Sequence, residues 1–141
     1  MATEFSPPAV RYLTYPEAVT LHIMLMRRLE ETHFGVFDRS LVESALARPH
    51  HAATFEGADI VRQAATLCFG LIKNHPWRGG NKRTATILVD RFLHLNGLEL
   101  HTTVNDTVEM VLSVEADRWD VDALTAWYRQ RTFPVSPLDA K

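Results

Sequence analysis

The sequence has little cysteine, little net charge and no long apolar run. Cys68 is the only cysteine among 141 residues, so an internal disulfide cannot form and a reducing compartment fits. The net charge of −2 provides neither the basic footprint of a nucleic-acid-binding domain nor a polybasic face for a membrane. No apolar stretch reaches the roughly 18 residues of a transmembrane helix, and the N-terminus lacks signal-peptide features. These absences predict a cytoplasmic protein with no nucleic-acid or membrane partner.

The sequence also lacks the usual spacings of metal ligands. Its seven histidines form no HExxH motif and no Cys/His cluster. His50 and His51 are adjacent, whereas His94 and His101 stand far from any Cys or Glu at ligand spacing. We therefore predict no metal site made of histidine and cysteine ligands.

The composition that remains is ordinary for a globular protein, with 46% hydrophobic and 23% charged residues. Apolar residues recur at helical spacing, which predicts helices over residues 15–33, 39–48, 60–74, 82–96, 105–115 and a last one after Asp120. We predict one all-α domain, a compact bundle of about six helices spanning residues 11–131. An irregular lead-in (1–10) precedes it, and a tail (132–141) follows.

Residues with side-chain acceptors mark the expected helix starts. The predicted N-caps are Thr14 (in a capping box with Glu17), Asp38, Asp59, Asn81, Asn105 and Asp120. Pro49 is expected to end the second helix. The segment 49–58 would then be a loop or a short hairpin-like flap.

The stretch "HPWRGGNKRTA", residues 75–85, interrupts the most apolar part of the chain with polar and flexible residues. Gly79 and Gly80 allow a tight turn between two central helices. The first N–H groups of the second helix lack intrahelical partners and lie at the positive end of its dipole. Lys82 and Arg83 add full charges there. Together these features predict an anion site best suited to phosphate.

His75 precedes this anion site by a few residues. A neutral imidazole can take a proton from a hydroxyl at physiological pH, so His75 beside a polyphosphate would suit transfer of part of a nucleotide to a hydroxyl. Simpler interpretations remain open, because a histidine at a helix end is often a capping residue and Gly-Gly-Asn is often only a loop. The GxxxxGK[ST] spacing of a P-loop is absent.

The same stretch resembles the signature of the Fic/Doc superfamily, and "NKRTA" is similar to its Doc branch. The segments "YLTYPEAVTLH", "SLVESALARP" and "FLHLNGLEL" also resemble Doc proteins in the expected order. The resemblance covers about residues 11–131. It implies a toxin of a toxin–antitoxin pair that uses ATP to phosphorylate a threonine of elongation factor Tu and blocks translation. It also implies a cognate antitoxin as partner.

The resemblance also implies roles for individual residues. His75 would be the catalytic base. The nucleotide phosphates would be held by the remaining motif positions, Gly79, Gly80, Asn81, Lys82 and Arg83, together with Lys73. The segment 49–58 would be the flap that aligns the target peptide as an added strand, through His51, Thr54, Phe55 and Glu56.

Two positions depart from the family pattern. Trp77 replaces a phenylalanine that anchors the loop. Gly79 replaces the Asp or Glu that holds Mg²⁺ against the phosphates, so the metal expected for the family lacks its acidic ligand. The metal could be held by ATP and water alone or by Glu56 or Asp90, or Arg78 could supply the missing positive charge.

Two alternative functions follow from these residues. The first is AMP transfer by a Fic-type nucleotidyl transferase. Lys82 argues against it, since Fic enzymes have glycine there. The second is a non-catalytic nucleotide-binding or phosphate-binding relative, which Gly79 favours.

Overall fold

The computed structural model describes residues 9–136, which contain six helices and two short strands. The helices are α1 (Tyr15–Arg28), α2 (Arg39–Glu56), α3 (Ile60–Asn74), α4 (Asn81–Leu95), α5 (Val104–Glu115) and α6 (Val121–Arg131). Strands β1 (Leu98–Leu100) and β2 (Thr132–Pro134) pair antiparallel, so the expected tail begins with a strand. The predicted all-α bundle is confirmed. The rest of the expected lead-in and tail, residues 1–8 and 137–141, lies outside the described residues.

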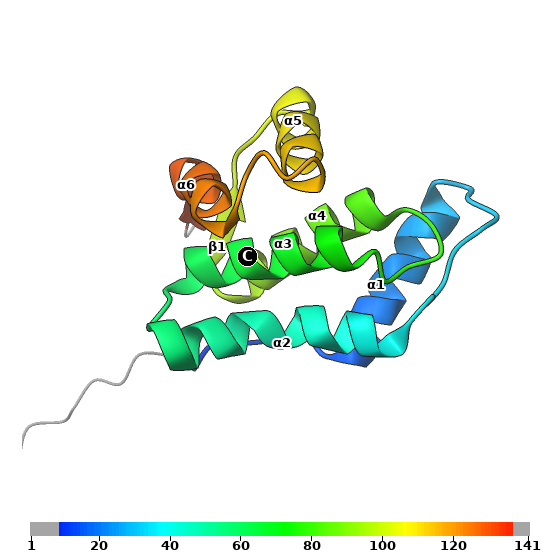
Figure 1. Ribbon diagram of the computed structural model, residues 1–141, viewed down its shortest axis with the longest axis horizontal. Coiled ribbons are helices and arrows are strands. Elements are labelled where there is room, and N and C mark those ends of the chain that lie inside the picture. The colour runs from blue at the N-terminus through cyan, green and yellow to red at the C-terminus, as the bar shows by residue number, and fades with distance from the viewer. Residues whose placement is uncertain (1–8, 137–141) are drawn as a thin grey trace, which may run out of the picture.

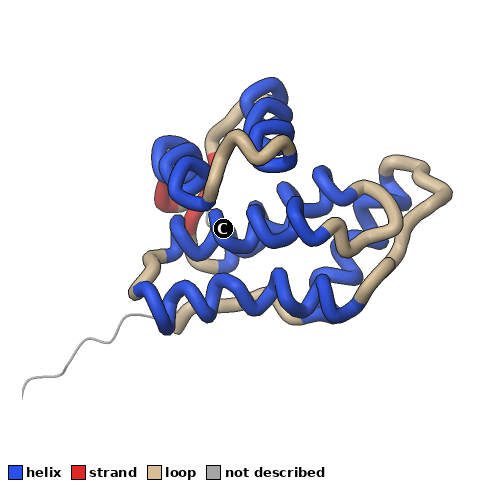
Figure 2. Tube along the Cα trace, in the orientation of Figure 1, coloured by secondary structure: helices blue, strands red, loops and turns tan. Residues whose placement is uncertain are grey.

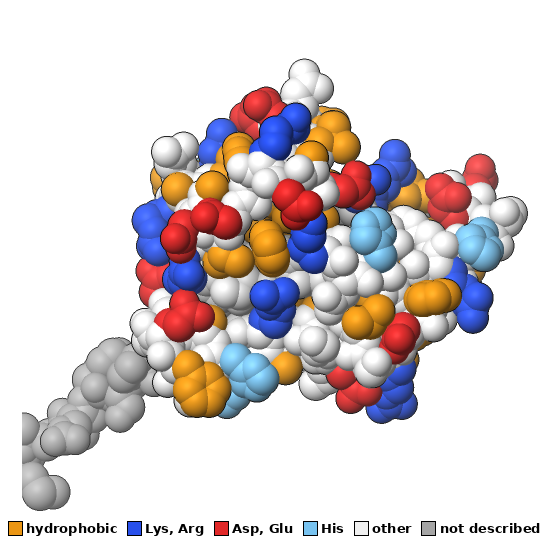
Figure 3. All heavy atoms as spheres, viewed as in Figure 1, with side chains coloured by type: hydrophobic (Ala, Val, Ile, Leu, Met, Phe, Trp, Pro, Cys, Tyr) orange, Lys and Arg blue, Asp and Glu red, His pale blue; other side chains and the backbone are white. Residues whose placement is uncertain are grey.

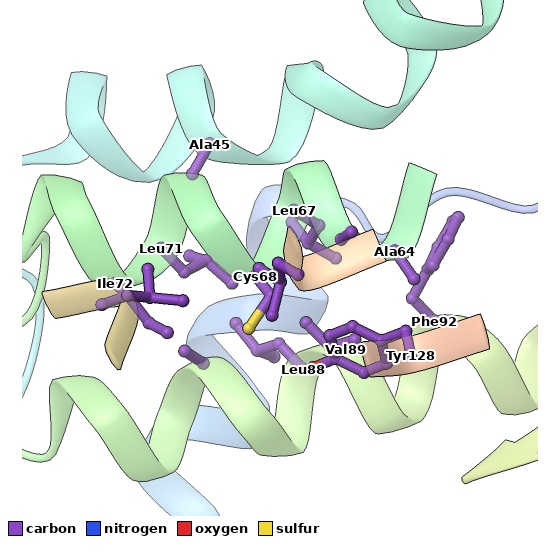
Figure 4. Packing of buried hydrophobic residues seen from close by; sticks show 14 of the residues in the cluster. Ala45, Ala64, Leu67, Cys68, Leu71, Ile72, Leu88, Val89, Phe92 and Tyr128 are labelled. Atoms are coloured by element: carbon purple, nitrogen blue, oxygen red, sulfur yellow. The ribbon is translucent and has the colours of Figure 1, made fainter. Parts of the chain in front are cut away.

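Helix α3 is the centre of the bundle, with α2, α4 and α6 packed around it (Figures 1 and 2). Most of its residues from Gln63 to Ile72 are buried, as expected for a helix that is apolar on nearly all sides. Figure 4 shows Cys68 among side chains of α4 and α6, including Leu88 and Tyr128. Burial raises the pKa of the Cys68 thiol to about 12, so it is a packing residue rather than a nucleophile. None of the described helices has the length and apolar character needed to span a bilayer.

Most of the predicted helix starts are confirmed. The Oγ1 of Thr14 accepts from the backbone N–H of Glu17, whose carboxylate accepts from the backbone N–H of Thr14. The side chains of Asp38, Asp59 and Asp120 cap α2, α3 and α6. The cap of α5 is Thr103 rather than Asn105, because Thr103 stands at the extended residue before the first helical turn.

Helix α2 continues through Pro49, so the predicted loop or flap at 49–58 is wrong. Proline removes one helical hydrogen bond, but its ring lies on the buried stripe of α2. The buried residues of that stripe are Val42, Ala45, Pro49 and Ala52. Burial of this stripe offsets the lost bond. The helix ends instead at Gly57, which adopts a left-handed conformation with φ of 65°.

Helix α1 ends at Arg28 rather than at residue 33. Glu30 takes a positive φ of 57° and turns the chain away from the helical path. Residues 29–38 therefore form a connection, here called the 29–38 loop. It passes beside the turn between α3 and α4, where Val36 and Trp77 form an isolated antiparallel β-bridge. A segment predicted to be partly helical thus borders the motif.

Candidate phosphate-binding active site

Residues 75–80 form the turn between α3 and α4, at one end of the bundle (Figure 1). Trp77 is buried and stacks on the ring of His22, with the centroids 4.3 Å apart. The side chain of Asn81 closes the turn, because its Oδ1 accepts from the N–H of Trp77 at 3.0 Å and its Nδ2 donates to the carbonyl of Trp77 at 2.9 Å. Asn81 is the first residue of α4 and not its N-cap, and its side-chain oxygen and one of its two amide hydrogens are used within the turn.

The N-terminus of α4 has no side-chain cap. Its N-cap is Gly80, with φ of 65° and no side chain to accept a hydrogen bond. Each of the other helices within residues 9–136 is capped by a Thr or Asp side chain. The first N–H groups of α4 thus stay open to an external anion at the positive end of the dipole. Lys82 and Arg83 are exposed beside them, as the sequence predicts.

Two acidic residues, at the end of α5 and just beyond it, lie against basic residues of the site. One carboxylate oxygen of Glu115 lies 3.6 Å from Nε2 of His75 and 3.2 Å from Nζ of Lys82. Asp117, just beyond α5, forms an ion pair with Lys73. Lys73 is therefore near the site but already paired. Neither acid was predicted from the sequence, since nothing in their spacing relates them to the motif.

The 29–38 loop runs along the other side of the turn. The N–H of Phe37 donates to the carbonyl of Pro76 at 2.9 Å, and the N–H of Arg78 donates to the carbonyl of Gly35 at 2.8 Å. The side chain of Arg78 also donates from Nε to the carbonyl of Val36 at 3.2 Å. Arg78 thus holds the loop against the turn.

The predicted flap residues lie away from this site. They occupy the last two turns of α2, beside the start of α3, whereas the motif follows the end of α3 (Figure 1). The 15 residues of α3 span roughly 22 Å at 1.5 Å per residue. The four residues concerned are His51, Thr54, Phe55 and Glu56. The structure brings the motif and the 29–38 loop together, and not the motif and the end of α2.

Position 79 has no room for a side chain. A Cβ atom added to Gly79 would lie 2.4 Å from the carbonyl oxygen of His33 in the 29–38 loop. The other acids considered do not reach the turn, because Glu56 pairs with Arg62 at 3.1 Å at the far end of α3 and Asp90 is more than two turns along α4. Within residues 9–136, no three His, Cys, Asp or Glu side chains cluster as metal ligands do. The donor set does not fit a Mg²⁺ ion held by the protein.

His22 is a buried residue of α1 that contacts the 29–38 loop, Trp77 of the turn and Thr84 of α4. Its Nε2 accepts from the N–H of Gly35 at 3.0 Å, which places the ring proton of the neutral form on Nδ1. Nδ1 lies 2.8 Å from Oγ1 of Thr84 on α4. Burial lowers the pKa of His22 to about 4. The neutral ring thus ties α1, the 29–38 loop and α4 together.

We expect acid to destabilise the protein through His22. An unfolded His22 takes up a proton near its ordinary pKa of 6.5, but the folded one does so only near 4. The unfolded state binds more protons between these values, so stability falls as pH falls from 6.5 to 4, by about 3 kcal/mol. Urea unfolding across this range measures the loss. His22→Gln, which cannot titrate, should be less stable than the wild type at pH 7, but its free energy of unfolding should change less between pH 6.5 and 4. An equally steep loss of stability in the variant would contradict the assignment.

A shallow groove opens beside the anion site. It has a volume of about 190 Å³ and runs between α4 and α5. Its lining residues are Lys82, Arg83, Thr86, Thr107, Val108, Val111 and Leu112. The groove is thus cationic at the anion site and apolar along α5. On the face of the molecule seen in Figure 3, acidic and basic side chains are interspersed.

Two comparisons with known proteins show the family of the chain. Residues 12–93 match the sequence profile of the Fic/DOC family, a segment that includes α1, the 29–38 loop and the whole motif. The chain is also 37% identical over 97 residues to a protein named Toxin Doc from Mycolicibacterium smegmatis (strain ATCC 700084 / mc(2)155). That match covers 64% of this chain and 73% of the relative. The protein is a member of the Fic/Doc family.

Proposed function

We propose that the chain is a Doc-like toxin that transfers the γ-phosphate of ATP to a protein hydroxyl and so blocks translation. A threonine of elongation factor Tu is the expected target, and a cognate antitoxin the expected partner. The observation that carries the proposal is the position of His75 beside the uncapped N-terminus of α4, with Lys82 and Arg83 at the same place. ATP and the proposed target place the activity in the cytoplasm.

The proposed reaction uses side chains and backbone groups of the motif. The imidazole of His75 takes the proton from the target hydroxyl, whose oxygen forms a bond to the γ-phosphorus. The bond between the γ-phosphorus and the bridging oxygen breaks, and ADP leaves. The open N–H groups of α4, with Lys82 and Arg83, stabilise the phosphate charge. The adjoining groove between α4 and α5 is where we place the rest of the nucleotide.

The proposal contains no step through a metal ion, because the residues around Gly79 do not fit one. This feature supports one alternative, a relative that binds phosphate without catalysis. Lys82 and Arg83 provide two positive charges at the phosphates in either case.

ATP labelled at the α or the γ position separates these functions. The purified chain is incubated with elongation factor Tu and either label, and a reaction without the chain serves as control. Transfer of the γ label to the factor is the expected result. Transfer of the α label would instead indicate an AMP transferase. ATP binding with neither label transferred would contradict the proposed kinase activity on this target.

A further inference from the structure

Glu115 is the last residue of α5 and lies outside the motif. One of its carboxylate oxygens faces both Nε2 of His75, at 3.6 Å, and Nζ of Lys82, at 3.2 Å. The core holds this end of α5 in place, because Met110, Val111 and Val114 of the same helix are buried there. The side chain itself is 33% exposed, so a ligand can reach the pair.

The turn cannot provide a carboxylate of its own at its fifth residue. Gly79 stands there, and a Cβ would meet the carbonyl oxygen of His33 at 2.4 Å. Negative charge beside the base therefore comes from another helix. We infer that Glu115 is a positioning residue of the phosphotransferase site, holding His75 and Lys82 in place through one carboxylate. The effect of Glu115 on kcat rests on the proposed function, whereas its effect on ATP binding does not require turnover.

The carboxylate has two opposite effects on the proposed reaction. When His75 accepts the hydroxyl proton it becomes positively charged, and a carboxylate 3.6 Å from Nε2 stabilises that charge. The same carboxylate competes with the phosphates of ATP for the ammonium of Lys82. Glu115 thus accelerates the chemical step and weakens ATP binding.

Glu115→Gln separates the two effects, because it keeps the shape of the side chain and removes its charge. We expect kcat for phosphate transfer to fall about tenfold, since a general base contributes 10²-fold or more and Glu115 acts only through it. We also expect the Kd for ATP, measured by calorimetry, to tighten about two- to fivefold, as for the loss of a partly exposed ion pair. Glu115→Asp, which retains the charge, should recover part of kcat.

The matched control is Glu109→Gln, an exposed residue of the same helix with the same change of charge. It should leave both kcat and Kd near the wild-type values. Equal kcat in the two Gln variants would overturn the inference. Weaker ATP binding in Glu115→Gln would also overturn it, because a merely structural role predicts loss of both kcat and ATP affinity. Calorimetry needs no turnover. If the wild-type chain transfers no phosphate, the proposed function fails, and the direction of the Kd change alone decides the role of Glu115.

Discussion

Replacing His75 is expected to abolish the growth arrest that the wild-type chain causes when it is expressed in bacteria. In the proposed reaction His75 is the group that takes the hydroxyl proton, and loss of a general base lowers rates by about 10²- to 10⁴-fold. The arrest should disappear in His75→Ala at equal protein level. In vitro, transfer of the γ-phosphate should fall by at least about 10²-fold.

The backbone at this position requires a second variant. His75 has φ of 46° and ψ of 55°, a left-handed conformation that asparagine tolerates better than alanine. His75→Asn therefore removes the base with less backbone strain and should be equally inactive. His51→Ala, an exposed histidine on the last turns of α2, should retain the arrest. Arrest that persists in both His75 variants would contradict a catalytic role and favour a binding protein.

Gly79→Ala is expected to destabilise the protein, although it adds a single methyl group. The new Cβ would lie 2.4 Å from the backbone oxygen of His33, and a backbone carbonyl cannot rotate away as a side chain can. The 29–38 loop must move, which strains the hydrogen bond from Arg78 to Gly35. We expect a loss of about 1–3 kcal/mol in the free energy of unfolding, typical of overpacking, measured by urea denaturation.

Gly70→Ala is the matched control for this effect. Its Cβ would come as close, 2.5 Å, but to the flexible side chain of Arg48. Alanine also favours the helix over glycine by about 1 kcal/mol, so this variant should lie within about 1 kcal/mol of the wild type. Equal stability of the two variants would refute the steric assignment at Gly79.

The same clash predicts the behaviour of Gly79→Asp. This change restores the acidic residue of the family pattern, but its Cβ meets the same carbonyl oxygen. It should therefore be destabilised like Gly79→Ala and should not gain phosphotransferase activity. The glycine is better understood as an adaptation to the close 29–38 loop than as a simple loss of a ligand.

Much of the fold could be predicted from the sequence because helix starts and apolar stripes are local features. The capping box at Thr14, the cap at Asp59 and the central position of α3 required only neighbouring residues. Pro49 shows the limit of such local rules. Its missing N–H predicts a helix end, but its ring lies on the buried stripe of α2. Burial of this stripe stabilises the helix by more than the missing hydrogen bond costs.

The candidate site, like the fold, has some features that local sequence predicts and others that it does not. The candidate anion site and the candidate base His75 were predicted from eleven consecutive residues. The resemblance to the Fic/Doc family was found in the same stretch and in three other segments. The predicted phosphate contacts of Asn81 and Lys73 stay predictions, although both side chains also have partners within the protein. The side chain of Asn81 is used to close the turn, and that of Lys73 is paired with Asp117. The partner of Asn81, Trp77, belongs to the motif, whereas Asp117, the partner of Lys73, lies outside it.

The sequence by itself determined most of the helix starts, because these depend on groups within a few residues of one another. It also indicated the family of the protein and a candidate anion site at the start of α4. Only the tertiary structure decided which carboxylate faces His75 and Lys82, which loop borders the turn, and why position 79 is glycine. Glu115 lies 30 residues after the end of the motif, and His33 lies 42 residues before its start. Their approach results from packing of α1 and α5 against the core, which no local spacing encodes.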